Sequence, residues 1–190
     1  LLDFGTTGRL RFSNMIMYDR QSETWWQQGT GEGIAGKYAG RTLTQRPVSL
    51  IAWADFKAAH PQVTVLCRET GLQRSYGVNP YAGYDDPNQQ PFLYQGTATP
   101  AKMPELARVL ALQINGDAVA FPYTALAARR VLTDTVGGQA VVILWAAGLA
   151  SPLDAAQVAE GRDVGAALAF ARELDGQPLD FGFVNGVITD

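Results

Sequence analysis

The sequence predicts a mainly β protein, of the α+β class with few short helices, built from antiparallel hairpins. Three pairs of turn-forming residues, Asn115-Gly116, Gly137-Gly138 and Asp175-Gly176, each separate two runs of apolar residues. Such pairs readily adopt the positive φ angles that tight hairpin turns require. Signals for helix starts are fewer, and the segments they open are short. The two ends of the chain also resemble each other, which predicts two incomplete copies of an internal repeat.

Three short helices are expected from their capping residues. Ser49 is placed to cap a helix over residues 50–59, which ends at His60-Pro61, and Thr124 is placed to cap residues 125–130. The motif Ser151-Pro152-Leu153-Asp154 has the cap, the early proline and the acid of a third helix start.

The strands follow from apolar runs beside the turns. We expect strands over residues 63–66, 109–114, 118–121, 132–136, 140–145, 166–174 and 179–184. The run 140–145 is apolar throughout, which is typical of a buried strand.

The internal repeat is inferred from the chain ends. Leu2-Asp3-Phe4-Gly5 recurs as Leu179-Asp180-Phe181-Gly182, and each copy leads to Asn, four residues and Asp. We therefore expect the chain to begin inside one repeat and end inside the next, with unpaired edges near the termini. The expected parts are the C-terminal part of a first repeat (1–76), an ordered connecting loop (77–100) and the N-terminal part of a second repeat (101–190). The alternative is two unrelated strands with similar turns.

Composition excludes several classes of protein. The 190 residues are 47% hydrophobic and 17% charged, which is typical of a globular chain. A net charge of −3 supplies no basic surface that would follow phosphates, so we expect no nucleic-acid partner. The longest apolar run, 140–150, is about half the roughly 20 residues that a membrane-spanning helix needs, so no such segment is expected. The first residue is Leu1 rather than Met, and we expect an upstream segment.

Single copies of cysteine and histidine limit the chemistry. Cys67 cannot form a disulfide within the chain, and one Cys with one His cannot supply a structural zinc site, so no metal is expected. A catalytic pair of His60 and Cys67 is disfavoured, because His60 is placed at a helix end and Cys67 at the end of a strand.

The motif Gly31-Glu32-Gly33-Ile34-Ala35-Gly36 matches the glycine spacing of dinucleotide-binding turns. It should then open a helix after a parallel strand, but Gly40 and Pro47 follow and Glu32 would repel a pyrophosphate. We therefore expect no cofactor, and interpret the glycines as a turn where the backbone passes close to a packed tryptophan.

Carboxylates offer two further alternatives. Pairs drawn from Asp19, Glu23, Glu32, Asp85 and Asp86 could provide the acid and base for glycoside cleavage, which depends on a separation that the sequence does not fix. The segment from Asp85 to Asn88 lacks the regular spacing of a calcium loop, and a capped turn is favoured there.

Trp25 and Trp26 are adjacent, so in a strand their side chains point to opposite faces. Only one of them can serve a single core. The other either packs under a second layer or forms an exposed platform for a sugar or aromatic ligand, and the more exposed one is expected to border any ligand pocket.

Nearly the whole chain resembles a bacterial and archaeal family known as domain-of-unknown-function family 3179 (DUF 3179). The residues that carry the resemblance are Gly8, Leu10, Ser13-Asn14, Met17 to Gln21, Glu23 to Gln27, Gly31-Glu32, Ile34 to Gly36, Ala39-Gly40, Trp53, His60-Pro61, Gly71, Tyr76-Gly77, Asn79 to Tyr81, Tyr84-Asp85, Val131 to Trp145 and Glu160 to Gly165.

The resemblance implies a largely β protein of two repeats, exported or membrane-anchored, with no assigned reaction. It also implies an upstream half-repeat with a Cys-Pro-x-Cys motif. The matching strand here, Leu144-Trp145-Ala146-Ala147, has no cysteine, so no metal or thiol function is carried over.

The leading hypothesis is a non-catalytic binding or interaction module located outside the cytoplasm, whose partner is a small molecule, a glycan or a protein. The alternative is an enzyme that uses carboxylates here or cysteines upstream, and a purely structural domain stays open. The candidate ligand-binding residues are Asp19, Arg20, Trp25, Trp26, Gln27, Tyr76, Tyr81 and Asp85.

Overall fold

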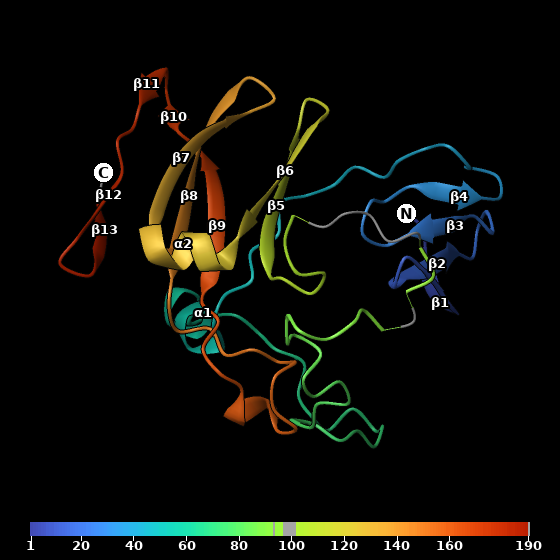
Figure 1. Ribbon diagram of the computed structural model, residues 1–190. Coiled ribbons are helices and arrows are strands. Elements are labelled where there is room, and N and C mark those ends of the chain that lie inside the picture. The colour runs from blue at the N-terminus through green and yellow to red at the C-terminus, as the bar shows by residue number, and fades with distance from the viewer. Residues whose placement is uncertain (93, 97–101, 190) are drawn as a thin grey trace. The chain divides into compact units, whose positions relative to one another are not determined.

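In the computed structural model, strands hold 37% of the described residues and helices 9%, which confirms a mainly β fold with antiparallel hairpins (Figure 1). The structure describes residues 1–92, 94–96 and 102–189. The chain divides into two units, each with its own internal packing: unit 1 holds Leu1–Val48 and Gln90–Glu105, and unit 2 holds Ser49–Gln89 and Leu106–Asp190.

Unit 1 is built on one antiparallel sheet in the order β1-β2-β3-β4. Its strands are β1 (Phe4–Arg11), β2 (Asn14–Asp19), β3 (Trp25–Gln27) and β4 (Gly33–Ala35). Sequential order is the simplest way to pair strands whose connections are short. It places β2 and β3, which carry the aromatic candidates, at the centre of the sheet.

Unit 2 is built on a three-stranded antiparallel sheet in the order β7-β8-β9. Its strands are β7 (Val131–Val136), β8 (Gln139–Ala146) and β9 (Ala166–Ala171). Three separate hairpins accompany it: β5 (Val109–Ile114) with β6 (Asp117–Pro122), β10 (Glu173–Leu174) with β11 (Gln177–Pro178), and β12 (Gly182–Val184) with β13 (Val187–Thr189). The helical segments are α1 (Trp53–Ala59), α2 (Tyr123–Arg129) and the short 3-10 turn η1 (Val158–Glu160).

The core of unit 2 lies between α2 and the central strand β8. Leu126 of α2 and Ile143 of β8 are 2% and 0% exposed, and they belong to one cluster of buried side chains. The cluster consists of Phe121, Leu126, Val136, Val141, Ile143, Trp145 and Ala167. The apolar run predicted to be a buried strand is therefore the centre of this core.

The turn dipeptides form the turns expected of them. Asn115-Gly116 and Gly137-Gly138 have positive φ at both residues and close the hairpins β5-β6 and β7-β8. Asp175-Gly176 also turns with positive φ, but its hairpin β10-β11 pairs only two residues on each side. The expected partner strand instead forms the separate hairpin β12-β13.

Four local predictions are wrong: one strand, two helix caps and one helix. The segment 63–66 forms no strand and is exposed. The helices α1 and α2 begin at Trp53 and Tyr123, after Ala52 and Pro122, with no side-chain cap from Ser49 or Thr124.

No helix starts at Ser151, because the carbonyl groups that a helix would use are already bonded. The carbonyls of residues 153–156 accept hydrogen bonds from Tyr84, Gly83 and Asn79 in the loop 79–84. These bonds replace the helical pattern and leave only η1 farther along.

The expected connecting loop 77–100 contains turns and irregular structure where it is described, and residues 93 and 97–100 lie outside the described part. Residues 77–89 belong to unit 2 and residues from Gln90 onward to unit 1.

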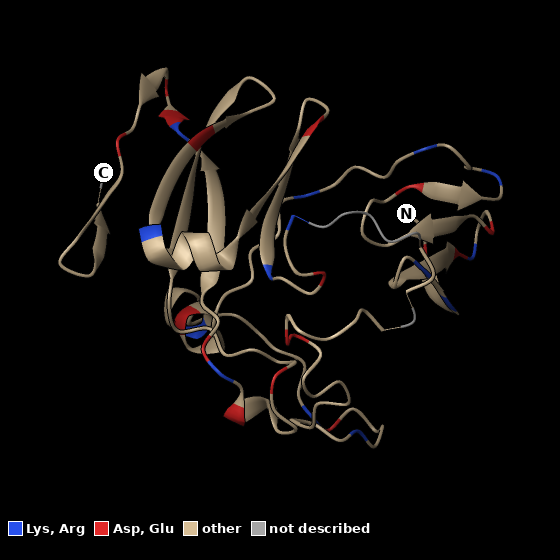
Figure 2. Ribbon diagram, viewed as in Figure 1, with Lys and Arg blue, Asp and Glu red and all other residues tan. Residues whose placement is uncertain are grey.

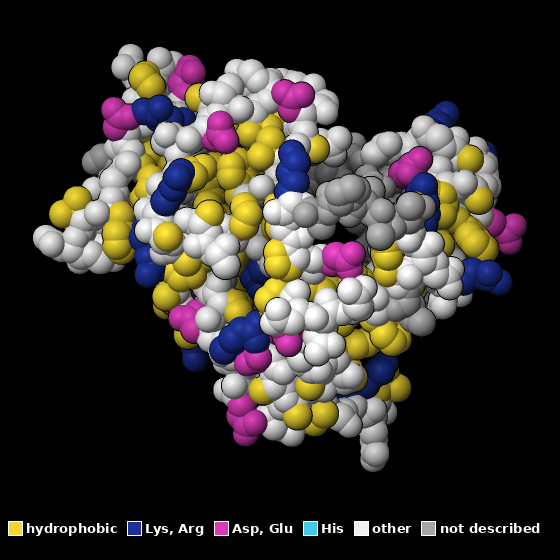
Figure 3. Space-filling view, in the orientation of Figure 1, with side chains coloured by type: hydrophobic (Ala, Val, Ile, Leu, Met, Phe, Trp, Pro, Cys, Tyr) yellow, Lys and Arg dark blue, Asp and Glu magenta, His cyan; other side chains and the backbone are white. Residues whose placement is uncertain are grey.

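Both chain ends form antiparallel hairpins closed by two-residue turns, Phe12-Ser13 and Asn185-Gly186, with positive φ throughout. The matched asparagines differ, however: Asn14 is the first residue of β2, whereas Asn185 lies in its turn. The internal repeat and the division at 76 and 100 therefore stay predictions. Hydrophobic side chains are exposed on the C-terminal hairpin (Figure 3), namely Phe183, Val184 and Val187.

Candidate functional site

Trp25 and Trp26 lie on opposite faces of β3, as their adjacency predicts. Trp26 is 3% exposed and Trp25 is 36% exposed. Trp25 pairs with Tyr18 across the sheet, whereas Trp26 pairs with Met17. The sheet of unit 1 therefore has a packed face under Trp26 and an open face that carries Trp25.

The packed face contains a buried carboxylate. Asp19, at the end of β2, is fully buried and accepts a hydrogen bond from the Trp26 indole Nε1 at 2.9 Å. The Ser22 backbone N–H donates to Asp19 Oδ1 at 2.6 Å, and the Ser22 hydroxyl donates to Asp19 Oδ2 at 2.5 Å. The buried Thr24 hydroxyl contacts that of Ser22 at 2.8 Å. This network fixes the turn between β2 and β3, and with it the position of both tryptophans.

Hydrogen bonding decides the ionisation of Asp19. Burial raises the pKa of its carboxyl, but the hydrogen bonds from Ser22 and Trp26 outweigh burial, so the pKa lies below its ordinary value. A carboxyl with a lowered folded-state pKa stabilises the fold above its unfolded-state pKa of about 4, and that contribution is lost as the pH falls through the folded-state pKa.

We expect Asp19→Asn to be less stable than the parent at pH 6, with the difference shrinking below about pH 4. Urea unfolding at several pH values measures it. Asp117→Asn, which removes an exposed carboxylate on β6, controls for the change of one charge. A difference between parent and Asp19→Asn that is independent of pH would contradict the assigned direction of the pKa shift.

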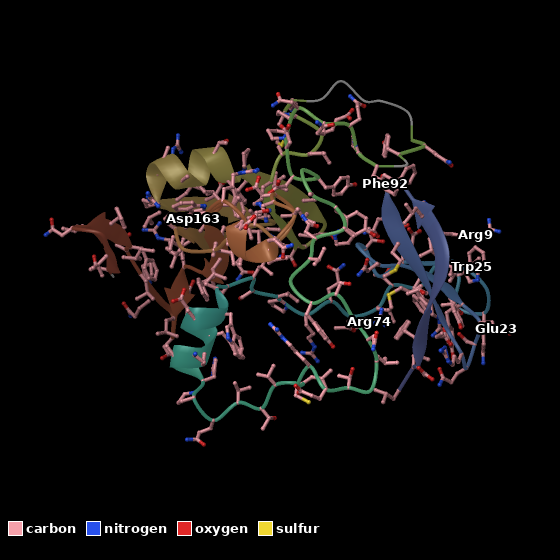
Figure 4. All side chains as sticks on the ribbon, turned by 90° about the horizontal axis from the view of Figure 1, so that it is seen from below. Arg9, Glu23, Trp25, Arg74, Phe92 and Asp163 are labelled. Carbon is pink, nitrogen blue, oxygen red and sulfur yellow. The ribbon has the colours of Figure 1, made fainter. Side chains whose placement is uncertain are left out.

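The open face of unit 1 combines aromatic rings with arginines. Tyr18 and Trp25 are direct cross-strand partners, so their side chains are neighbours on one face. The Arg20 guanidinium lies 5.4 Å from the Tyr18 ring centroid, and the Arg9 guanidinium lies 5.9 Å from that of Trp25. We name these four residues the aromatic–arginine face; Figure 4 labels Arg9 and Trp25 side by side.

Two glycines of β1 shape this face. A Cβ on Gly5 would lie 2.7 Å from the Tyr18 ring and 2.9 Å from Arg20 Nη1, so glycine lets both groups lie over the strand. Gly8 has a φ of 71° inside a bulge where the pairing with β2 shifts between Thr6 and Leu10. Bulges redirect neighbouring side chains, and this one accompanies Arg9, which extends over Trp25.

The eight candidate residues divide between the units. Asp19, Arg20, Trp25, Trp26 and Gln27 lie in unit 1, and Tyr76, Tyr81 and Asp85 lie in unit 2. Within unit 1, only Arg20 and Trp25 are on the open face. Gln27 is 5% exposed, and its side chain donates a hydrogen bond to Asn14 Oδ1 at 2.5 Å, so it supports the hairpin β1-β2 from inside.

In unit 2 the aromatic candidates are exposed and the acid is not. Tyr76 and Tyr81 are 46% and 54% exposed, and Tyr81 contacts Tyr84 with ring centroids 6.3 Å apart. The Asp85 side chain is 7% exposed and forms ion pairs with Arg108 at 3.4 Å and Arg162 at 3.2 Å.

Ser151, which is fully buried, donates a short hydrogen bond to the Asp85 carboxylate. We name Asp85, Arg108, Ser151 and Arg162 the Asp85 cluster. It joins the loop 79–85 to the segment 151–162, and its carboxylate is neutralised from within the unit.

The glycine motif forms no nucleotide-binding turn. Gly33 lies in β4, and a Cβ there would overlap the Tyr38 carbonyl and lie 3.3 Å from the Trp26 indole. This confirms a glycine-rich segment that passes close to a packed tryptophan. No helix follows it directly.

The structure does not support a thiol nucleophile with an imidazole base. His60 terminates α1, as predicted, and its ring contacts that of Phe56 in a tilted arrangement with centroids 4.8 Å apart. Cys67 is exposed. Among the described residues, no group of three or more His, Cys, Asp or Glu side chains could hold a metal ion.

Sequence reasoning missed the functional candidates that depend on contacts between distant segments. Arg9 was missed because a β-bulge brings it to Trp25. The only sequence signal for this bulge is Gly8. Arg108, Ser151 and Arg162 were missed because they meet Asp85 from 23 to 77 residues away.

Neither of two cavities in unit 2, of about 390 and 230 Å³, is lined by Trp25. The smaller one is apolar and lies between residues of α1 and the strands β8 and β9. The expectation that the more exposed tryptophan borders a pocket is therefore not met at either cavity. Trp25 instead belongs to the open face of a sheet.

No helix in the described part of the chain is long and apolar enough to cross a membrane. No curated protein matches the chain, and no solved structure does. A family model described as "Protein of unknown function (DUF3179)" matches residues 1–187. Because this match covers almost the entire sequence, the chain belongs to the DUF3179 family.

Proposed function

We propose that this chain is a non-catalytic binding module whose aromatic–arginine face receives a ligand with a sugar ring or another flat surface. The observation that carries the proposal is Trp25, which is 36% exposed on the sheet of unit 1 beside the Arg9 guanidinium. A large ring held rigidly beside a polar group offers both contact area and orientation to a ligand.

The support beneath Trp25 favours binding. Trp26, next in sequence, is anchored by Asp19, and Phe4 packs on its ring with centroids 6.5 Å apart. Trp25 therefore belongs to a strand whose backbone position is fixed before any ligand arrives. Preorganisation of this kind lowers the entropic cost of binding.

The carboxylates considered for catalysis support a binding role. Asp19 is buried, the Asp85 side chain is 7% exposed, and both are bonded within their own units. Glu32 pairs with Arg11 at 3.2 Å. A general acid or base needs to reach its substrate, and the two aspartates are directed toward structural partners.

Indole N–H signals in a nitrogen-labelled sample provide the test. The chain has four tryptophans, and Trp25→Phe identifies the signal of Trp25. In titrations with neutral oligosaccharides, acidic oligosaccharides and small aromatic acids, we expect at least one class to shift that signal. Trp25→Ala is expected to weaken binding at least about tenfold, as loss of a central aromatic contact does.

Trp53→Ala is the matched control, because Trp53 is 53% exposed on α1 in unit 2, and it should leave the affinity unchanged. A Trp25 signal that stays constant with every ligand in a folded sample would overturn the proposal. Tyr76→Ala and Tyr81→Ala, tested in the same way, show whether the exposed tyrosines of unit 2 form a second contact surface, which we also propose.

The proposal includes a location outside the cytoplasm, supported by the family resemblance. Fractionation of the producing organism, with detection of the native protein, tests it. We expect the protein in the exported or membrane fraction, and recovery only with cytoplasmic proteins would contradict this location.

A further inference from the structure

Basic residues are concentrated in the sheet segment of unit 1. Residues 1–48 contain six Lys and Arg against four Asp and Glu, although the whole chain has a net charge of −3. Figure 2 shows these charges on the ribbon. One of the four acids, Asp19, is buried. The exposed surface of this segment therefore favours a negatively charged ligand.

Five of these six basic side chains lie over aromatic rings. The pairs are Arg9 with Trp25, Arg11 with Phe12, Arg20 with Tyr18, and both Lys37 and Arg41 with Tyr38, at 5.2 to 5.9 Å from the ring centroids. Such contacts orient a cation while leaving its polar edge available.

Arg9 is the uncompensated cation of the aromatic–arginine face. Arg20 pairs with Asp3 at 3.5 Å, and Arg11 pairs with Glu32 at 3.2 Å. Within residues 1–92, 94–96 and 102–189, Arg9 has no carboxylate partner. The bulge at Gly8 thus accompanies one unpaired guanidinium beside the most exposed ring of the face.

We propose that the ligand of this face is an acidic saccharide, in which Trp25 contacts a sugar ring and Arg9 binds the carboxylate of a uronic acid. This inference rests on the proposed function and specifies its ligand class. A guanidinium matches a carboxylate through two parallel hydrogen bonds, and stacking on Trp25 sets the distance between ring and charge. A nucleic acid is disfavoured at this face, because Arg20 pairs with Asp3. Among the described residues of the face, Arg9 alone is then unpaired, and a single cation cannot follow a row of phosphates.

The test compares two ligands with the same sugar rings, tetragalacturonate and its fully methyl-esterified form, in which neutral methyl esters replace the carboxylates. At about 20 mM salt, we expect the acid to bind about tenfold more tightly than the ester, the fold-change of one charge-assisted hydrogen bond. Raising the salt to about 200 mM should weaken binding of the acid and not that of the ester. Calorimetry measures both affinities, and the Trp25 indole signal reports the location.

Arg9→Gln should lower the affinity for the acid about tenfold and leave that for the ester unchanged. Arg46→Gln removes the same charge from an exposed position of unit 1, and it should have little effect on either ligand. A nitrogen-labelled sample confirms that both variants keep the four indole signals of the folded protein.

The outcomes separate this inference from the proposed function. Equal affinities for the acid and the ester at Trp25 would overturn the proposal that the ligand is acidic, and so would binding of the acid that Arg9→Gln does not weaken. In both cases the proposal of a ligand-binding face would remain supported. A single-stranded oligonucleotide that displaces the acid with higher affinity would assign the face to nucleic acid and overturn the saccharide. If neither sugar nor any other ligand shifts the Trp25 signal, both proposals fail.

Discussion

Replacing Asp85 with alanine is expected to lower the free energy of unfolding by about 3 kcal/mol, the lower end of the cost of breaking a buried ion pair. The substitution leaves the fully buried Ser151 hydroxyl without its acceptor and Arg108 without its counter-ion. The expected cost lies at the lower end of that range because the Arg162 side chain is 46% exposed, so water solvates its guanidinium once the carboxylate is removed.

The Asp85 cluster holds a part of unit 2 that has little regular structure. The loop 79–85 and the segment 151–162 contain no helix or named strand beyond the short turn η1. The side-chain bonds of the cluster therefore add to the backbone hydrogen bonds that join the two segments. The Arg162 side chain pairs with both Asp85 and Asp154, and its backbone N–H donates to Asp154 Oδ2 at 2.7 Å. Loss of Asp85 is therefore expected to loosen both segments together.

Urea unfolding followed by circular dichroism measures the effect, and amide hydrogen exchange locates it. Asp117→Ala is the control: Asp117 is an exposed carboxylate on β6 of the same unit, and its loss should cost under about 0.5 kcal/mol, as is typical of a surface position. Equal effects of the two substitutions, or faster exchange in unit 1 alone, would contradict a role for Asp85 in joining these segments.

The predictable parts of the fold are those governed by neighbouring residues. The pair Asn115-Gly116 fixes a two-residue turn through its positive φ values, and the apolar runs on either side then pair in register. Alternation along a strand likewise places the side chains of Trp25 and Trp26 on opposite faces. Each of these inferences needs only a few consecutive residues.

The parts that could not be predicted depend on partners far away in the sequence. Ser151 has the appearance of a helix cap, but its hydroxyl bonds to Asp85, which is 66 residues away. Arg9 reaches Trp25 from a bulge, where regular alternation of side chains no longer applies. Of the four residues of the aromatic–arginine face, Trp25 and Arg20 could thus be named from the sequence, whereas Tyr18 and the unpaired Arg9 could not.

Gly165 precedes β9 at the point where the chain passes the indole of Trp145. Its φ is 71°, and a Cβ at this position would overlap the indole ring. Trp145 has little room to move, because it is 7% exposed within the core cluster and the Arg130 guanidinium lies 4.3 Å from its ring centroid. A side chain at position 165 therefore lowers the stability of the fold in two ways: it strains the backbone at a positive φ, and it overlaps the Trp145 indole.

We expect Gly165→Ala to destabilise the protein by about 3 kcal/mol, the sum of roughly 1 kcal/mol for an L-residue in the left-handed region and roughly 2 kcal/mol for overpacking against the core. Gly176→Ala isolates the first cost, since its φ is 76° and nothing lies within 4 Å of the added Cβ, and it should lose about 1 kcal/mol. Urea unfolding of both variants measures the difference.

A second test uses Trp145→Phe, which has a smaller ring. In this background, Gly165→Ala should lower the free energy of unfolding by less than it does in the parent, because the two residues touch. If Gly165→Ala and Gly176→Ala lowered the free energy of unfolding equally, the Trp145 indole would be able to move away from the added methyl group at no cost, and the prediction of overpacking would be wrong.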